Sequence, residues 1–206
     1  MGFYVDRFAP RLTHLCCGSR RIAEQRGLIV PQAEGVVVEI GFGSGHNLGF
    51  YRKGKVTQVV GVEPNAGMLR LADRNLAAAP VPVEFHQGVA EDLPLETHSA
   101  DTAVLTYTLC SVAEPARALS ELRRVLKPSG KLLLLEHGRS DEPGVARWQD
   151  RLDPFWTVCA AGCHLNRPTR QAVEAAGFSI EQLDTFYLRG APHVLGFHSR
   201  GIAVPR

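Results

Sequence analysis

Short apolar runs, each followed by a polar or glycine-rich turn, recur along the chain. Five of them are rich in β-branched residues or leucine and predict buried strands: residues 36–40, 57–62, 83–88, 100–106 and 131–136. Helical spacing of apolar residues follows the second strand at 65–72, where Asn65 is the expected N-cap, and the fourth at 114–125. A helix is also expected to begin near 44–47. This alternation predicts an α/β fold.

The N-terminal segment, residues 3–28, has helical spacing of its apolar positions. These positions are Phe8, Leu12, Leu15, Cys16 and Ile22. Pro10 is expected to open or interrupt the helix, Gly27 to end it, and Arg20 and Arg26 to lie with other arginines on the opposite face. We interpret the segment as packed on the domain and partly covering a ligand, with contact to a membrane surface as the alternative.

The last third of the chain departs from the βα alternation. Residues 145–161 predict a helix bent or restarted at Pro154, and 170–176 a short helix stopped by Gly177. Two strands at 178–188 and 194–204 are expected to form an antiparallel hairpin. A turn is expected at 127–130. We therefore expect one domain, 1–206, with an N-terminal helical lid (1–30) and a helical insertion on the substrate side (139–176).

Composition excludes several classes of protein. The 206 residues carry a net charge of +2, too little to indicate nucleic-acid binding. No apolar stretch reaches the roughly 18 residues of a membrane span, and no signal-peptide core is present, so a cytoplasmic location is expected. The five cysteines lack C-x-x-C spacing. Cys159, Cys163 and His164 do not match a zinc motif, and no metal is expected.

The first strand leads into a turn with glycine at Gly41, Gly43 and Gly45. A strand, a glycine turn and a following helix start make a cradle of free N–H groups for a polar ligand. The spacing differs from the dinucleotide fingerprint, and the turn lacks the lysine of a triphosphate loop. Glu63, at the end of the second strand, can accept hydrogen bonds from both hydroxyls of a ribose.

Glu39-x-Gly41-x-Gly43-x-Gly45 together with the acidic end of the second strand resembles the class I S-adenosylmethionine-dependent methyltransferases. The resemblance implies a Rossmann-like, mostly parallel seven-stranded sheet of order 3-2-1-4-5-7-6, helices on both faces and an antiparallel C-terminal hairpin. It implies S-adenosylmethionine as cofactor and S-adenosylhomocysteine as product. Val89 stands where the family has an aspartate that holds the adenine. The indicated cofactor residues are Glu39, Gly41, Gly43, Ser44, Gly45, Asn47, Glu63, Pro64, Asn65, Met68, Gly88, Val89, Ala90, Glu91, Thr106, Tyr107 and Cys110.

Motifs in the second half, among them Leu109-Cys110-Ser111-Val112 and Gly162-Cys163-His164, resemble the animal alkyl-thiol methyltransferases. This implies methyl transfer to a small molecule, a thiol in particular. Lipid headgroups or quinone-type rings are the alternative acceptors, and a non-catalytic cofactor-binding protein is the alternative of another class. His137 and Asp153 are the catalytic candidates; a structural donor and a helix cap are their ordinary roles.

The acceptor pocket is expected to involve Tyr4, Leu109, Ser111, Trp148, Trp156 and His164. Tryptophans in such positions are more often part of the core than of a pocket wall. Membrane contact is expected to be peripheral at most, and the chain to be a monomer or a homodimer.

Overall fold

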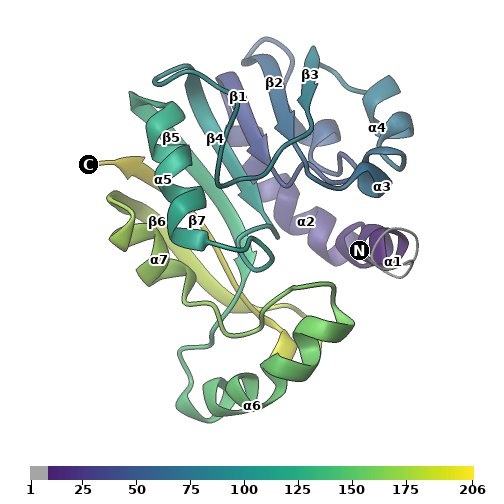
Figure 1. The fold of residues 1–206 in the computed structure, drawn as a ribbon, viewed down its shortest axis with the longest axis vertical. Coiled ribbons are helices and arrows are strands. Elements are labelled where there is room, and N and C mark those ends of the chain that lie inside the picture. The colour runs from purple at the N-terminus through teal and green to yellow at the C-terminus, as the bar shows by residue number, and fades with distance from the viewer. Residues whose placement is uncertain (1–8) are drawn as a thin grey trace.

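A computed structural model describes residues 9–206 as a seven-stranded sheet of order β3-β2-β1-β4-β5-β7-β6 (Figure 1). The strands are β1 Gly35–Ile40, β2 Val56–Val62, β3 Val83–His86, β4 Ala100–Thr106, β5 Leu126–His137, β6 Phe178–Tyr187 and β7 Phe197–Pro205. β1 to β5 are parallel, and β7 lies antiparallel between β5 and β6. The sheet order and closing hairpin expected from the sequence are confirmed.

Helices cover both faces of the sheet. The helices are α1 Ala9–Cys17, α2 Arg20–Ile29, α3 Ala66–Leu69, α4 Asp73–Ala77, α5 Pro115–Val125, α6 Pro143–Cys159 and α7 Thr169–Ala175, with 3₁₀ turns η2 Val30–Gln32, η3 Leu48–Phe50 and η4 His193–Leu195. Side chains of β5 alternate between two apolar cores. Leu132 and Leu134 face the core that includes α5 and α7, and Leu133 and Leu135 the one that includes the end of α2.

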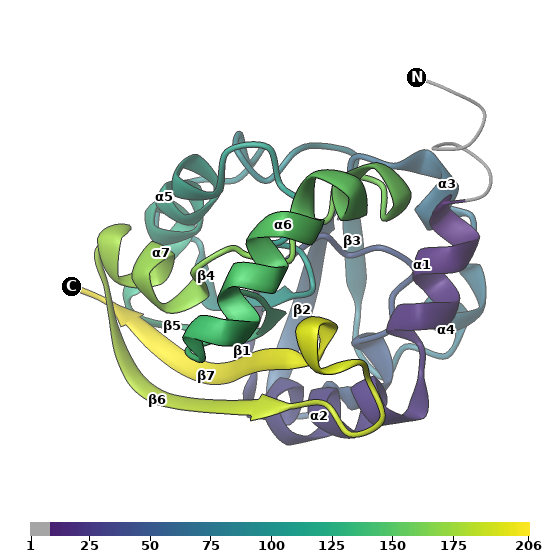
Figure 2. The ribbon, with the colours of Figure 1, turned by 90° about the horizontal axis from the view of Figure 1, so that it is seen from below.

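Helix α6 follows β5 directly and lies beyond the carboxyl ends of the parallel strands (Figure 1). Seen from below, it crosses in front of that end of the sheet, with α1 next to α3 and with α2 across the sheet from α5 and α7 (Figure 2). The N-terminal helices and the insertion therefore border the end of the sheet where the glycine turn lies. Within residues 9–206, none of the helices combines the length and apolar character that a bilayer crossing requires.

The helix expected after the glycine turn is replaced by the single 3₁₀ turn η3. Gly45 and Gly49 each lower helical stability by about 1 kcal/mol, and the chain must return to β2 at Val56. Gly27 was expected to end a helix but lies inside α2, which continues to Ile29. The expected turn at 127–130 is instead an irregular start of β5, because Ala100 pairs with Leu126 and Thr102 with Lys131.

Two expectations for the N-terminal segment are wrong. Arg26 is not on the solvent face but 4% exposed, because polar partners lie under α2. Leu12 and Leu15 do not pack on the domain; they are 52% and 71% exposed, because α1 contacts the domain through His14. The Asn65 N-cap is confirmed, since its side chain accepts from the N–H groups of Gly67 and Met68.

Candidate active site

The glycine turn begins at the end of β1 with Gly41 in a left-handed conformation, at φ +65°. A Cβ atom there would lie 2.1 Å from Thr108 Oγ1, so no larger residue fits. The Thr108 hydroxyl donates to the Ile40 carbonyl at 3.1 Å. The turn is therefore held closely against the segment that follows β4, which brings two separate parts of the predicted site together.

Glu63 is fixed at the end of β2 by backbone amides. Its Oε2 accepts from the Gly43 N–H at 2.9 Å, and its Oε1 accepts from the Asn65 N–H at 3.0 Å. Burial raises the pKa of Glu63, while the two amide hydrogen bonds lower it. Each carboxylate oxygen keeps a further lone pair, so Glu63 can still accept hydrogen bonds from a ligand beside the turn.

The loop after β3 lies on the far side of Glu63, whose carbonyl accepts from the Gly88 N–H at 3.4 Å. Ala90 is buried, whereas the Val89 side chain is 46% exposed. Glu91 accepts from the Glu114 N–H at 3.0 Å, which ties this loop to the start of α5. From α3, Met68 reaches the turn: its Cε lies 3.2 Å from where a Cβ of Gly43 would stand.

Glu39, Asn47 and Thr106, three of the predicted cofactor residues, belong to a buried hydrogen-bonded network beneath the turn. Arg26 Nη1 donates to Asn47 Oδ1 and to Thr106 Oγ1, both at 2.7 Å. Asn47 donates to Glu39 Oε1 at 2.9 Å, and the Tyr51 hydroxyl to Glu39 Oε2 at 2.6 Å. Burial raises the pKa of Glu39 to about 7 against these contacts. The network fixes the underside of the turn.

Sequence reasoning missed Arg26, although a signal for it exists. Ile22, Arg26 and Ile29 follow the i, i+4, i+7 spacing of one helix face, and all three are buried. An arginine inside an apolar stripe needs buried acceptors, and the polar residues around the glycine turn provide them.

Helix α1 covers the glycine turn through two histidines. His14 Nδ1 lies 2.7 Å from Ser44 Oγ, and His46 Nε2 donates to the His14 carbonyl at 3.0 Å. The two rings stack with centroids 4.7 Å apart. Burial is the main reason that the pKa of His46 is lowered to about 4. The imidazole of His46 is therefore neutral at physiological pH.

The end of β4 presents polar atoms without partners in the structure. Tyr107, directly after β4, has φ +55°, and its buried hydroxyl has no hydrogen-bond partner among the described residues. Glu136, at the end of β5, accepts from the N–H groups of Thr108 and Leu109 through Oε1, but its buried Oε2 has no such partner. Strained backbone and unsatisfied polar atoms are typical of ligand sites.

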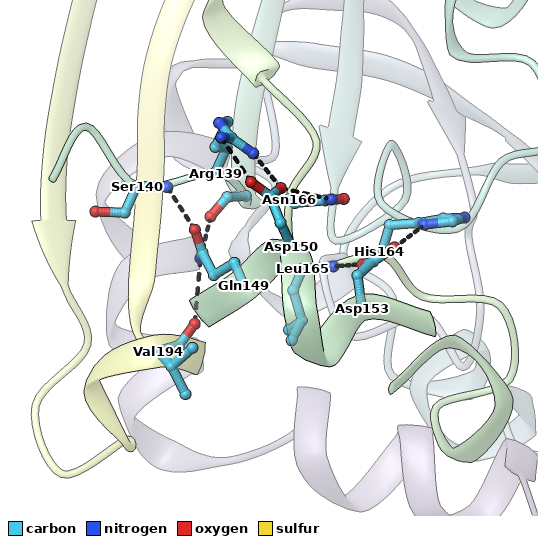
Figure 3. Close-up of polar contacts among 10 residues, drawn as sticks. Arg139, Ser140, Gln149, Asp150, Asp153, His164, Leu165, Asn166 and Val194 are labelled. Atoms are coloured by element: carbon cyan, nitrogen blue, oxygen red, sulfur yellow. Dashed lines mark hydrogen bonds and ion pairs between the residues drawn. The ribbon is translucent and has the colours of Figure 1, made fainter. Parts of the chain in front are cut away.

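Polar contacts attach the insertion to the end of β5 (Figure 3). Gln149 of α6 accepts from the Ser140 N–H at 2.8 Å and donates to the carbonyls of Gly138 and Val194. Asp150 on the same helix pairs with Arg139. These bonds place α6 over the carboxyl ends of the strands.

Asp153, a predicted catalytic residue, is also engaged inside the insertion (Figure 3). Its Oδ1 accepts from the Leu165 N–H at 2.6 Å, and its Oδ2 lies 2.8 Å from His164 Nδ1. The carboxylate therefore holds the loop after α6 on the helix.

His137, the other predicted catalytic residue, lies with two cysteines at the ends of β4 and β5. Its Nε2 is 3.0 Å from Cys163 Sγ. The possible ligand atoms of Cys110, His137 and Cys163 all lie within 4.8 Å of one another. Cys159, considered with Cys163 from the sequence, is exposed and does not belong to this group. The three residues are far apart in the sequence, and the fold brings them together.

The predicted acceptor-pocket residues lie in different places. Leu109 is 1% exposed in the apolar core, and Ser111 is exposed beside Cys110, with their Oγ and Sγ atoms 3.4 Å apart. Trp156 has a buried indole N–H without a partner among the described residues. Trp148 is 57% exposed and lines a surface depression of about 490 Å³ together with Glu142 and His193. This depression is not lined by residues at the carboxyl ends of the parallel strands. Tyr4 lies outside the described residues.

The chain was compared with protein families, with individual proteins and with solved structures. Residues 38–134 match the family model of the methyltransferase domain. The chain is 35% identical over 172 residues to thiol S-methyltransferase TMT1B of Rattus norvegicus, which covers 79% of this chain and 70% of that protein. It is 32% identical over 177 residues to thiol S-methyltransferase TMT1A of Homo sapiens, covering 81% and 71%.

Among solved structures, the chain resembles an S-adenosylmethionine-dependent methyltransferase of Thermotoga maritima, described as a possible histamine N-methyltransferase. The TM-score is 0.70 at 24% sequence identity, and the match covers 99% of both chains. At this identity the likeness establishes the fold.

Proposed function

The chain belongs to the class I S-adenosylmethionine-dependent methyltransferases, and from this membership we propose that its methyl acceptor is a small-molecule thiol. The 35% identity to a thiol S-methyltransferase, over 79% of this chain, is the observation that carries the acceptor class. The imidazole of His137 at the strand ends supports it, because a neighbouring imidazole can favour the thiolate form of a thiol.

The residues around the glycine turn fit the cofactor. S-adenosylmethionine supplies a methyl group activated on a positively charged sulfur. We assign the turn of Gly41 to Gly45 to its amino-acid part, Glu63 to the ribose hydroxyls, and the loop at Val89 and Ala90 to the adenine. The buried hydroxyl of Tyr107 has no hydrogen-bond partner among residues 9–206, and the bound cofactor would be a partner for it. Glu39, Asn47 and Thr106 support the turn from below.

The two catalytic candidates have different roles in this proposal. An acceptor thiol must lose its proton before its sulfur can attack a methyl group. We assign His137, beside Cys163 and Cys110, the role of favouring the deprotonated form of that sulfur. Asp153 is a positioning residue, because both of its oxygens are engaged by Leu165 and His164.

Two segments enclose the reaction. Helix α1 covers the glycine turn and acts as a lid on the cofactor. The insertion at 139–176 covers the strand ends and forms the acceptor side, where the buried indole N–H of Trp156 has no partner among the described residues. Cys16, Cys17, Cys110 and Cys163 form no disulfide bond, which suits a reducing compartment such as the cytoplasm.

A substrate screen that follows release of S-adenosylhomocysteine tests the acceptor class. Small alkyl thiols should give turnover, whereas amines, phenols, quinone-type rings and phospholipid vesicles should not. The Glu63→Ala variant, with weakened cofactor binding, is the matched control and should lose most of the signal at limiting cofactor. Turnover confined to any of the non-thiol acceptors would overturn the thiol assignment.

A further inference from the structure

Cys110, His137 and Cys163 form a compact group of soft ligand atoms. Cys110 is buried, whereas His137 and Cys163 are partly buried, so the group borders the surface at the strand ends. Nε2 of His137 is 3.0 Å from Cys163 Sγ, and all three ligand atoms lie within 4.8 Å of one another. Two sulfurs and an imidazole are the donors that Zn²⁺ and related metals prefer.

The backbone around this group is held by contacts that do not involve the sulfur atoms. The His164 N–H donates to the Cys110 carbonyl at 2.8 Å, and the Arg167 side chain donates to the Leu109 carbonyl. Gly138 follows His137, and a Cβ on Gly138 would lie 2.5 Å from the Arg167 carbonyl oxygen. The end of β5 is therefore in contact with the loop after α6. Cys163 is therefore positioned against Cys110 and His137 by the fold itself, which favours a preorganised site.

The spacing suits a tetrahedral ion after small adjustments. Zn–S bonds of about 2.3 Å and Zn–N bonds of about 2.0–2.1 Å place ligand atoms roughly 3.6–3.8 Å apart. The 3.0 Å between His137 and Cys163 must widen by about half an ångström, within reach of side-chain rotation. Three protein ligands leave a fourth position open, which is the arrangement of catalytic rather than structural zinc sites.

We propose that Cys110, His137 and Cys163 bind a thiophilic divalent metal ion, Zn²⁺ in particular, whose open position takes the sulfur of the methyl acceptor. This inference rests on the proposed thiol methyltransferase activity and explains how the acceptor loses its proton. The metal stabilises the thiolate relative to the thiol, so the proton passes to solvent when the acceptor binds.

The reaction then balances without a protein base. The acceptor sulfur uses a lone pair to form a bond to the methyl carbon, and the bond from that carbon to the cofactor's sulfur breaks. The electron pair of that bond stays on S-adenosylhomocysteine. The methylated product is a neutral thioether, a weaker ligand than a thiolate, and it leaves the metal.

Metal content of the purified chain tests the proposal directly. Full-length protein without a histidine tag is reduced, treated with chelator, incubated with Zn²⁺ and dialysed, and zinc is measured by mass spectrometry. We expect one zinc per chain in the wild type and in Cys16→Ser, which changes an exposed cysteine outside the group. Cys110→Ser, Cys163→Ser and His137→Gln should each retain at least tenfold less zinc, with circular dichroism confirming that they are folded.

Cobalt gives a second readout that a misfolded variant cannot imitate. Co²⁺-loaded wild type should show the sulfur-to-metal charge-transfer band in the near ultraviolet and the intense visible bands of tetrahedral cobalt, and adding a small alkyl thiol should shift them. Zinc binding by wild type no tighter than by a Cys110→Ser, Cys163→Ser double variant would overturn the metal site.

Activity separates this inference from the proposed function. Removing the metal should lower kcat/KM for thiols by at least 100-fold, and restoring Zn²⁺ should recover it. Thiol turnover that is unchanged in metal-free protein would refute the catalytic metal and leave the thiol acceptor intact. Zinc binding that depends on the three ligands, without turnover of any thiol, would support the site and refute the acceptor class.

Discussion

Replacing Arg26 by methionine tests whether one guanidinium holds the polar network beneath the glycine turn. Methionine has a similar length and an apolar stem like that of arginine, but it donates no hydrogen bond. The change removes both 2.7 Å bonds, to Asn47 and to Thr106, and the cation over the ring of Tyr107 at 5.4 Å. All of the lost acceptors are buried, so water does not replace Arg26.

The expected loss of stability follows from these contacts. A hydrogen bond from a charged donor contributes about 1.5–3 kcal/mol, and removing one member of a buried charged network costs about 3–5 kcal/mol. Arg26 also lowers the pKa of Glu39, so in its absence Glu39 should become protonated at neutral pH, which limits the cost. We therefore expect a loss of about 3–5 kcal/mol, or roughly 6–20 °C in Tm for a chain of this size.

The assay is urea and thermal unfolding at pH 7, with Arg20→Met as the matched control. Arg20 lies on the same helix, but its side chain is 93% exposed and forms a surface ion pair with Glu24, so its loss should change stability by less than about 0.5 kcal/mol. A difference between the two variants of less than about 1 kcal/mol would refute the view that Arg26 supports the turn.

Three further predictions concern the cofactor, the cover and the insertion. Glu63→Ala should weaken S-adenosylmethionine binding by about 1–3 kcal/mol in calorimetry, because the ribose hydroxyls lose their acceptor. An unchanged affinity would contradict the assignment of Glu63 to the ribose. The pKa of His46 is lowered to about 4 in the closed form, in which α1 lies on the glycine turn. In the open form, with α1 detached, His46 has an ordinary pKa, so below about pH 6.5 the closed form binds fewer protons than the open form. Hydrogen exchange of α1, corrected for its intrinsic rate, should therefore rise as pH falls from 6.5 to 4, and less so in His46→Phe; equal profiles would contradict this. Gln149→Leu should cost about 2–4 kcal/mol in urea unfolding, because two buried backbone groups and a partly buried one lose their partner. A cost equal to that of exposed Arg147→Ala would show that α6 docks without the Gln149 hydrogen bonds.

Much of the fold could be predicted because local pattern and topology agree. Apolar runs defined the strands, and Gly41, Gly43 and Gly45 with Glu63 located the turn that the structure places against Thr108. The confirmed sheet order came from the resemblance to a known family rather than from periodicity.

The rest depended on contacts between residues far apart in the chain. Arg26 was assigned to solvent because arginine is usually exposed, and only its position between Ile22 and Ile29 signalled burial. Cys110 and Cys163 are 53 residues apart in the sequence and match no metal-binding motif. They come together because the loop after α6 folds back onto the end of β4. Motif reading detects ligands adjacent in sequence and misses ligands that a fold assembles.

Helix α1 lies on the glycine turn, where His14 meets the hydroxyl of Ser44 and His46 meets the backbone of α1. In the lid role that we propose for α1, a molecule enters or leaves the turn while these hydrogen bonds are broken. The frequency with which the helix detaches thus sets a ceiling on the exchange of fresh cofactor for spent product, however fast the displacement at carbon runs.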